Sequence, residues 1–184
     1  MALIAEPRRM NPLLRLGVRV AERVTGRRMD PARLLAWYPR AAVSSGILET
    51  FVAHDEPSAR LLKLVRITAS VTATCAFCVD MNSAEHDGSG LTDAELTAVL
   101  ASSPETVDTF SERELIAIEY ARRISSTPLQ FPASFTDRLT LAFSEREIVI
   151  LATTAAQVNY WARTIQALGI PPAGFTDTCS VPER

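Results

Sequence analysis

Three helix starts in the second half of the chain constrain its fold more than any other feature. Each is a Ser or Thr followed three residues later by Glu. In this pattern the two side chains satisfy backbone amides that the first turn of a helix leaves open. The pairs are Thr92 with Glu95, Ser111 with Glu114, and Ser144 with Glu147. We therefore predict that one helix begins at each pair.

The third of these helices is predicted to run from Ser144 to about Leu168. Gly169 can take the left-handed conformation that closes a helix, and Pro171-Pro172 cannot continue one. The run from Ile148 to Leu151 is apolar on all sides. Such a run is typical of a buried central helix.

Prolines mark two helix starts upstream. Asp30-Pro31 and Glu56-Pro57 fit a capping residue followed by proline at the first helical position. The second start predicts a helix over residues 57–71.

A further helix is expected from about Thr74 to Glu85, ended by the turn His86-Asp87-Gly88-Ser89-Gly90. No segment alternates apolar and polar residues for long enough to indicate a strand. The sequence predicts six to nine helices and no sheet, which is an all-α, single-domain helical bundle.

Size and composition favour one domain. The chain has 184 residues, of which 47% are hydrophobic and 22% charged, enough for one core but too few for two ordinary domains. We expect a basic helical extension over residues 1–30, a helical domain over 31–172 and a tail over 173–184.

Neither a secretory signal nor a membrane span is expected. Charged residues and proline interrupt the apolar residues of Met1 to Val20. The most apolar stretch, Ile148 to Ala156, is far shorter than the roughly 20 residues that a span requires. We therefore expect a soluble, cytoplasmic protein.

The net charge is only -2, but it is unevenly distributed. Residues 1–66 carry 12 Lys and Arg against 6 Asp and Glu. A helix from Pro12 would have a basic side and an apolar side. The basic side carries Arg15, Arg19, Arg23 and Arg27, and the apolar side carries Leu13, Leu16, Val20 and Val24. This helix could bind anionic lipid or an acidic partner, but we favour a solvated face on a helix packed against the domain.

No nucleic-acid partner is expected, because the chain is acidic overall and lacks a binding motif.

Cys75-Ala76-Phe77-Cys78 is the one strong chemical motif. Two residues three apart on a helix have Cβ atoms about 5 to 6 Å apart, which allows a disulfide with little backbone movement. A cap at Thr72 or Thr74 would place the cysteines in the first turn, where open amide groups favour the reactive thiolate. By this reasoning Cys75 is the more strongly activated cysteine.

Two other interpretations of the cysteines compete with a redox pair. Structural zinc needs four ligands, and the rest of the chain offers only Cys179, His54 and His86, without zinc-site spacing. Two cysteines can also fill a core as small apolar side chains. We expect no metal and no cofactor, and we expect His54 to be a surface residue.

Several segments resemble the carboxymuconolactone decarboxylase family, in its alkylhydroperoxidase D-like branch. The resemblance covers roughly residues 40–172, and the stretch around the cysteines is its most specific part. The segments are Leu61-Leu-Lys-Leu-Val-Arg66, Cys75-Ala-Phe-Cys78-Val-Asp80-Met-Asn82, Gly90-Leu-Thr-Asp-Ala-Glu-Leu96, Phe143-Ser-Glu-Arg-Glu-Ile148, and Asn159 with Arg163.

This resemblance implies an all-helical fold, homo-oligomers, and a CxxC that reduces hydroperoxides and is recycled by a dithiol or thioredoxin-like reductant. It also implies that Cys78 attacks the peroxide and Cys75 resolves the product. Decarboxylation or lactone processing, as in the founding members, is an alternative, although those members generally lack the CxxC. A third interpretation is a non-catalytic thiol switch or oligomeric scaffold.

Two positions depart from the branch's proton relay. Its better-studied peroxidases have a His four residues after the second cysteine and a Glu twelve before the first, where this chain has Asn82 and Lys63. Asn82 can orient water or hold a thiol, and a nearby Lys63 could stabilise a thiolate. His86 is the obvious substitute on paper. Along a helix it lies about 12 Å from Cys78, which is too far for direct proton transfer.

Overall fold

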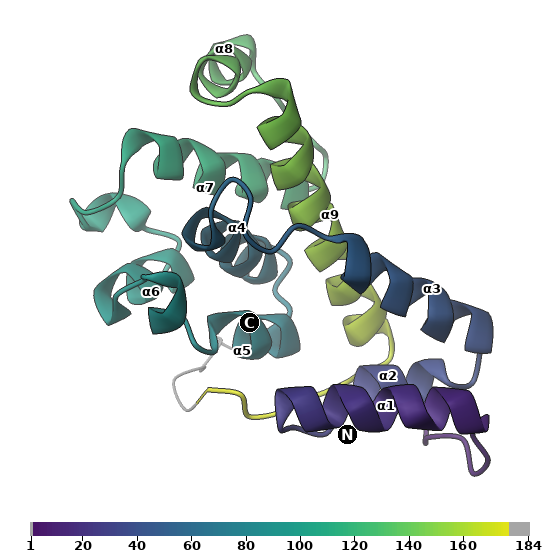
Figure 1. Ribbon diagram of the computed structural model, residues 1–184. Helices are drawn as coiled ribbons and strands as arrows, with labels where there is room; N and C mark the ends of the chain where they lie inside the picture. The colour runs from purple at the N-terminus through teal and green to yellow at the C-terminus, as the bar shows by residue number, and fades with distance from the viewer. Residues whose placement is uncertain (1, 177–184) are drawn as a thin grey trace.

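The computed structural model describes residues 2–176, and this part of the chain is all-helical, with nine α-helices, two short 3-10 helices and no strand. The predicted all-α class is therefore confirmed (Figure 1). The helices are α1 (Pro12–Thr25), α2 (Asp30–Leu35), α3 (Pro39–Phe51), α4 (Ala59–Thr72), α5 (Ala76–Ser83), η1 (Asp87–Ser89), α6 (Asp93–Leu100), η2 (Pro104–Thr106), α7 (Glu112–Ser125), α8 (Ala133–Ala142) and α9 (Glu145–Ala167).

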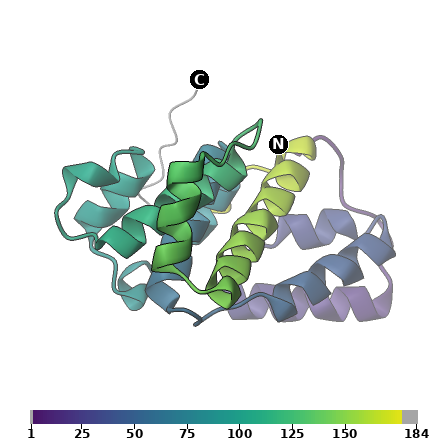
Figure 2. The same cartoon turned by 90° about the horizontal axis from the view of Figure 1, so that it is seen from above.

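Helices α4 and α9 form the centre of the molecule. Each packs against the other and against α5 and α7, and Leu62 of α4 and Leu151 of α9 are completely buried. In both views α1, α2 and α3 lie to one side of α9, and α6 and α7 lie to the other (Figures 1 and 2). The short helix α5 therefore lies where the two groups of helices meet.

The three predicted helix starts are confirmed in full. At Thr92, Ser111 and Ser144 the hydroxyl accepts from the backbone N–H three residues on, and the Glu there accepts from the backbone N–H of the Ser or Thr. The predicted end of the last helix is also confirmed, because Gly169 has a φ of +63°.

The run from Ile148 to Leu151 is not buried on all sides, so this prediction is wrong. Leu151 is buried, but Val149 is 60% exposed. At this end α9 packs on α4, α7 and α8 through one side, and the opposite side faces solvent. An all-apolar run therefore marks an exposed apolar surface here.

Both proline-based helix starts are displaced from their predicted positions. Met29 is the cap of α2, so Asp30 is already its first residue. Helix α4 begins after Ser58, whose hydroxyl accepts from Leu61 N at 3.1 Å. Ser58 supplies the capping oxygen, while Glu56 binds Arg146 at 2.5 Å instead.

Helix α1 packs through a face that the sequence did not single out. Its contact side holds the buried Val18 and the half-buried Leu14 and Ala21. The apolar stripe, which we define as Leu13, Leu16, Val20 and Val24, is exposed. An ion pair between Arg33 and Glu22, at 2.6 Å, joins α1 to α2. The helix thus packs against the protein and still leaves a second apolar face in solvent.

No helix in residues 2–176 is both long enough and apolar enough to cross a bilayer, and this includes α9, the longest of them.

Candidate redox site

The junction between α4 and α5 positions the cysteine pair. Helix α4 ends in two hydrogen bonds, from Thr74 N to Val71 O at 2.9 Å and from Cys75 N to Ser70 O at 3.1 Å. This is the Schellman arrangement, in which the residue after the cap is usually glycine. Thr74 occupies that position with a φ of +52°, a strained conformation for a β-branched residue.

Cys75 itself caps the next helix. Its Sγ accepts a hydrogen bond from Cys78 N at 3.2 Å. The predicted cap at Thr72 or Thr74 is therefore wrong, because those residues finish α4. The expected helix over 74–85 is also shorter at both ends, running from Ala76 to Ser83.

Cys75 and Cys78 form a disulfide, with their Cα atoms 5.2 Å apart. This confirms the pairing that their spacing predicts. Each cysteine is only 1% exposed, and both belong to a buried cluster that includes Phe77 and Ile165. The oxidised pair is thus enclosed and not displayed at the surface.

A buried carboxylate two residues after Cys78 holds the C-terminal segment. Asp80 accepts three backbone hydrogen bonds, from Ala173, Gly174 and Thr176, at 2.8 to 2.9 Å. The same segment brings Phe175 edge-on against Phe77, with ring centroids 6.3 Å apart. Asp80 belongs to the sequence motif around the cysteines, but the sequence predicted no role for it. An acidic residue inside an otherwise apolar buried turn is the signal that could have identified it.

Asn82 lies one helical turn after Cys78. Its Nδ2 donates to Ser70 Oγ at 3.0 Å, and Ser70 is the residue whose carbonyl holds Cys75 N. The structure therefore connects Asn82, through Ser70, to the turn in which Cys75 follows α4.

Lys63 is a residue of α4, and its side chain reaches the end of α5 that is farther from the cysteines. Its Nζ donates to the carbonyl of Ala84, the residue that follows the helix. Burial lowers the pKa of Lys63, and the neighbouring charge of Arg66 lowers it further. The structure thus pairs the amine with a backbone carbonyl.

The two histidines lie outside the cysteine turn. His86 Nε2 is 2.8 Å from Asp93 Oδ1, and its Nδ1 is 3.3 Å from Ser83 O. His54 is exposed, as predicted. Cys179 lies outside the described residues. Among residues 2–176, no three His, Cys, Asp or Glu side chains are grouped so that they could hold a metal ion.

Comparison with known proteins places this geometry in a known fold. No family model matches the chain. The uncharacterized protein YnjA of Escherichia coli (strain K12) is 33% identical over 144 residues, which are 76% of this chain and 72% of YnjA.

Two solved structures share the fold at lower identity. An uncharacterized peroxidase-related protein from Ralstonia eutropha JMP134, described as an alkylhydroperoxidase AhpD core, has a TM-score of 0.76 at 12% identity, over 93% of this chain and 92% of that one. The debrominase Bmp8, in complex with 2,3,4-tribromopyrrole, has a TM-score of 0.75 at 19% identity, over 92% of both chains. The chain has the alkylhydroperoxidase D-like helical fold, and it belongs to the family of Escherichia coli YnjA.

Proposed function

We propose that this protein is a CxxC-dependent hydroperoxide reductase, or a thiol-disulfide oxidoreductase built on the same pair. The observation that carries the proposal is the Cys75–Cys78 disulfide at the start of α5. Two cysteines that already meet across one helical turn can be oxidised and reduced without rearranging the fold.

In the proposed cycle the Cys78 thiolate attacks the outer oxygen of a hydroperoxide ROOH. The O–O bond breaks, Cys78 becomes a sulfenic acid, and the alkoxide takes a proton to leave as ROH. The Cys75 thiolate then attacks the sulfenic sulfur, forming the disulfide and releasing hydroxide, which becomes water on protonation. An external dithiol or thioredoxin-like protein reduces the disulfide and is itself oxidised to a disulfide.

The hydrogen bond at the helix start favours a thiolate at Cys75, and by itself it points to Cys75 and not Cys78 as the more activated nucleophile. In the reduced protein, the N–H of Cys78 is placed to donate to a thiolate at Cys75, as it now donates to Cys75 Sγ. A charge at this end of α5 is also favoured by the helix dipole. Cys78 is assigned the attack on peroxide from the family resemblance alone.

Burial of the pair makes access part of the proposal. A reductant must reach a sulfur atom that is now enclosed. The C-terminal segment, residues 173–176, is bound by Asp80 and packs against the cluster that contains the cysteines through Ala173 and Phe175. We infer that reduction follows local opening of this segment, since segments held by few contacts open more readily than a packed core.

The test is peroxide-dependent consumption of a dithiol by the purified protein. Cys75→Ser and Cys78→Ser should each abolish it, whereas Cys179→Ser, the matched control, should not. Cys78→Ser that retains full peroxide consumption would exclude the proposed roles. A protein that exchanges disulfides with a dithiol but ignores peroxide is an oxidoreductase only. No redox turnover at all would leave a thiol switch, a scaffold, or decarboxylase or lactone chemistry like that of the family founders.

A further inference from the structure

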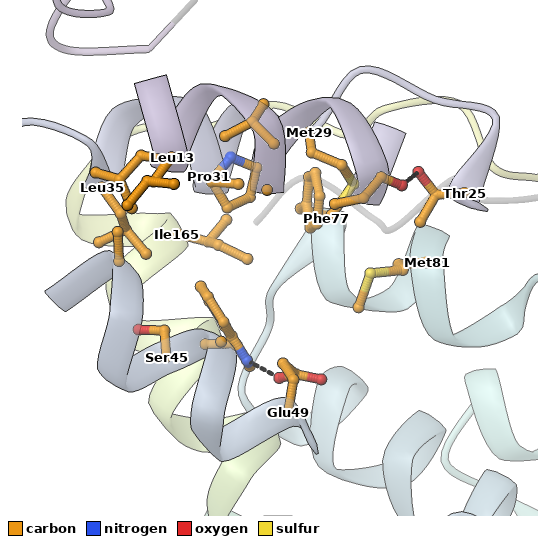
Figure 3. A pocket seen from close by; sticks show the side chains of 18 residues that line it. Leu13, Thr25, Met29, Pro31, Leu35, Ser45, Glu49, Phe77, Met81 and Ile165 are labelled. Carbon is orange, nitrogen blue, oxygen red and sulfur yellow. Dashed lines mark hydrogen bonds between the residues drawn. The ribbon is translucent and has the colours of Figure 1, made fainter. Parts of the chain in front are cut away.

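A cavity of about 470 Å³ lies between α1, α2, α3, α5 and α9. Leu35, Phe77, Met81 and Ile165 point into it (Figure 3). Its lining is mostly carbon, and its volume is within the range of about 300 to 1,000 Å³ that small-molecule sites occupy. Water in such a space finds few hydrogen-bond partners, so an apolar molecule can replace it favourably.

Two glycines within helices help to keep this space open. Gly17 of α1 and Gly46 of α3 both line the cavity, and a Cβ added at either position would meet no atom within 4 Å. Close packing therefore does not require glycine here. Glycine inside a helix is also about 1 kcal/mol less favourable than alanine. A larger side chain at either position would occupy part of the cavity.

One carboxylate gives the cavity a polar edge. Oε1 of Glu49 accepts hydrogen bonds from Gln157 Nε2 at 2.6 Å and from Trp161 Nε1, and Figure 3 shows Glu49 beside the apolar wall. Its Oε2 accepts no hydrogen bond from residues 2–176. A fixed carboxylate with an oxygen left to accept favours a ligand that presents an N–H or O–H group, and it disfavours an anion.

We propose that this cavity binds a neutral, largely apolar small molecule that carries one hydrogen-bond donor. The apolar part lies against Phe77, Met81 and Ile165, and the donor faces Glu49. Met81, together with Met29, which also lines the cavity, can adapt to ligands of different shape, because methionine is unbranched and flexible. This proposal does not depend on the redox function.

The probe is N-phenyl-1-naphthylamine, a neutral aromatic amine with one N–H group, whose fluorescence rises in apolar surroundings. We expect saturable binding to the full chain. Gly46→Leu and Gly17→Leu should each weaken it by at least about tenfold, which corresponds to about 1.4 kcal/mol, because leucine occupies the ligand's volume. Leucine also suits helices better than glycine, so the variants should fold, and circular dichroism checks this.

Gly88→Leu is the matched control. A Cβ added at Gly88 would also meet no atom within 4 Å, but this residue lies in η1, away from the cavity. The variant should bind the probe as the natural chain does. The anionic relative 8-anilino-1-naphthalenesulfonate should bind more weakly than the neutral probe, and Glu49→Gln should reduce that difference.

Two results would overturn the proposal. One is unchanged probe binding by folded Gly46→Leu and Gly17→Leu. The other is loss of binding in Leu16→Lys, since Leu16 lies on the exposed apolar stripe of α1 and not in the cavity. That loss would show that the probe adsorbs to the surface of α1.

Discussion

Asn82 donates a hydrogen bond from Nδ2 to Ser70 Oγ, at 3.0 Å. Ser70 in turn accepts the backbone N–H of Cys75 through its carbonyl, at 3.1 Å. At the position where the family resemblance implies a relay histidine, this chain has an amide that hydrogen-bonds to the residue holding Cys75. An amide can hold the turn, but it cannot give up a proton at neutral pH.

Asn82→His should raise peroxide turnover if the proposed reduction takes place. The imidazole would lie one turn from Cys78 on the same helix, and general acid help is typically worth about 10² to 10⁴ in rate. We expect an increase of at least about tenfold, measured as peroxide-dependent dithiol oxidation.

His86→Ala tests the competing source of the proton. His86 binds Asp93 and Ser83, so its removal should change turnover little. A loss of about tenfold or more with the fold intact would show that His86 supplies the proton, through ordered water.

Acid should lower the free energy of unfolding of the protein, because it protonates Glu95. Arg60 lowers the pKa of this buried carboxyl from 4.5 to about 2 by a hydrogen bond at 2.7 Å, and Thr109 adds another. The stabilisation is complete above pH 4.5, the ordinary pKa, and is lost as the pH falls through about 2. At about 1.4 kcal/mol per pKa unit, the loss is up to about 3 kcal/mol. Urea unfolding at pH 7 and at pH 3 measures the first part of this loss, about 2 kcal/mol.

Arg60→Met is the companion variant. It leaves both Glu95 and Glu114 without their cation, so we expect destabilisation of about 3 to 5 kcal/mol at pH 7. The variant should also lose less stability on acidification than the natural chain. An equal loss of stability on acidification in the variant and in the natural chain would mean that Glu95 is not the group that titrates.

Thr74→Gly should stabilise the protein by about 1 kcal/mol, because glycine adopts a positive φ without the strain that threonine bears. Thr72→Gly is the control. Thr72 is the last residue of α4, where glycine should destabilise by about 1 kcal/mol. If both changes destabilise the protein equally in thermal unfolding, Thr74 is not strained.

The protein should form a homo-oligomer. Phe51 at the end of α3 and Val24 on the apolar stripe of α1 are both at least 80% exposed, and the family resemblance implies that a second copy of the chain covers such surface. Light scattering should give a multiple of 20.1 kDa, and Phe51→Glu or Val24→Glu should lower it. A mass of one chain across a concentration series would contradict the prediction.

The sequence predicted those features that depend on neighbouring residues. The capping boxes at Thr92, Ser111 and Ser144 involve residues three apart, and all three formed. The disulfide also depends on a single helical turn. These interactions are local to the start of a helix. They can therefore be predicted without knowing the tertiary structure.

The features that the sequence did not predict depend on distant or competing partners. The cap at Cys75 follows from how α4 ends, with Thr74 in a position that normally favours glycine. Exposure of Val149 depends on which side of α9 the other helices cover. The cavity requires five helices to assemble, so no local pattern indicates it.

The contact between Asp80 and Ala173 joins residues that are 93 positions apart. Because a ribosome makes the chain from its N-terminus, Cys75 and Cys78 emerge long before Ala173, Gly174 and Thr176 exist to close over α5. A growing chain therefore carries both cysteines and Asp80 before the residues that bind Asp80 have been made. A chain that stops before Ala173 would lack the three backbone donors to Asp80 and would leave this buried carboxylate without them.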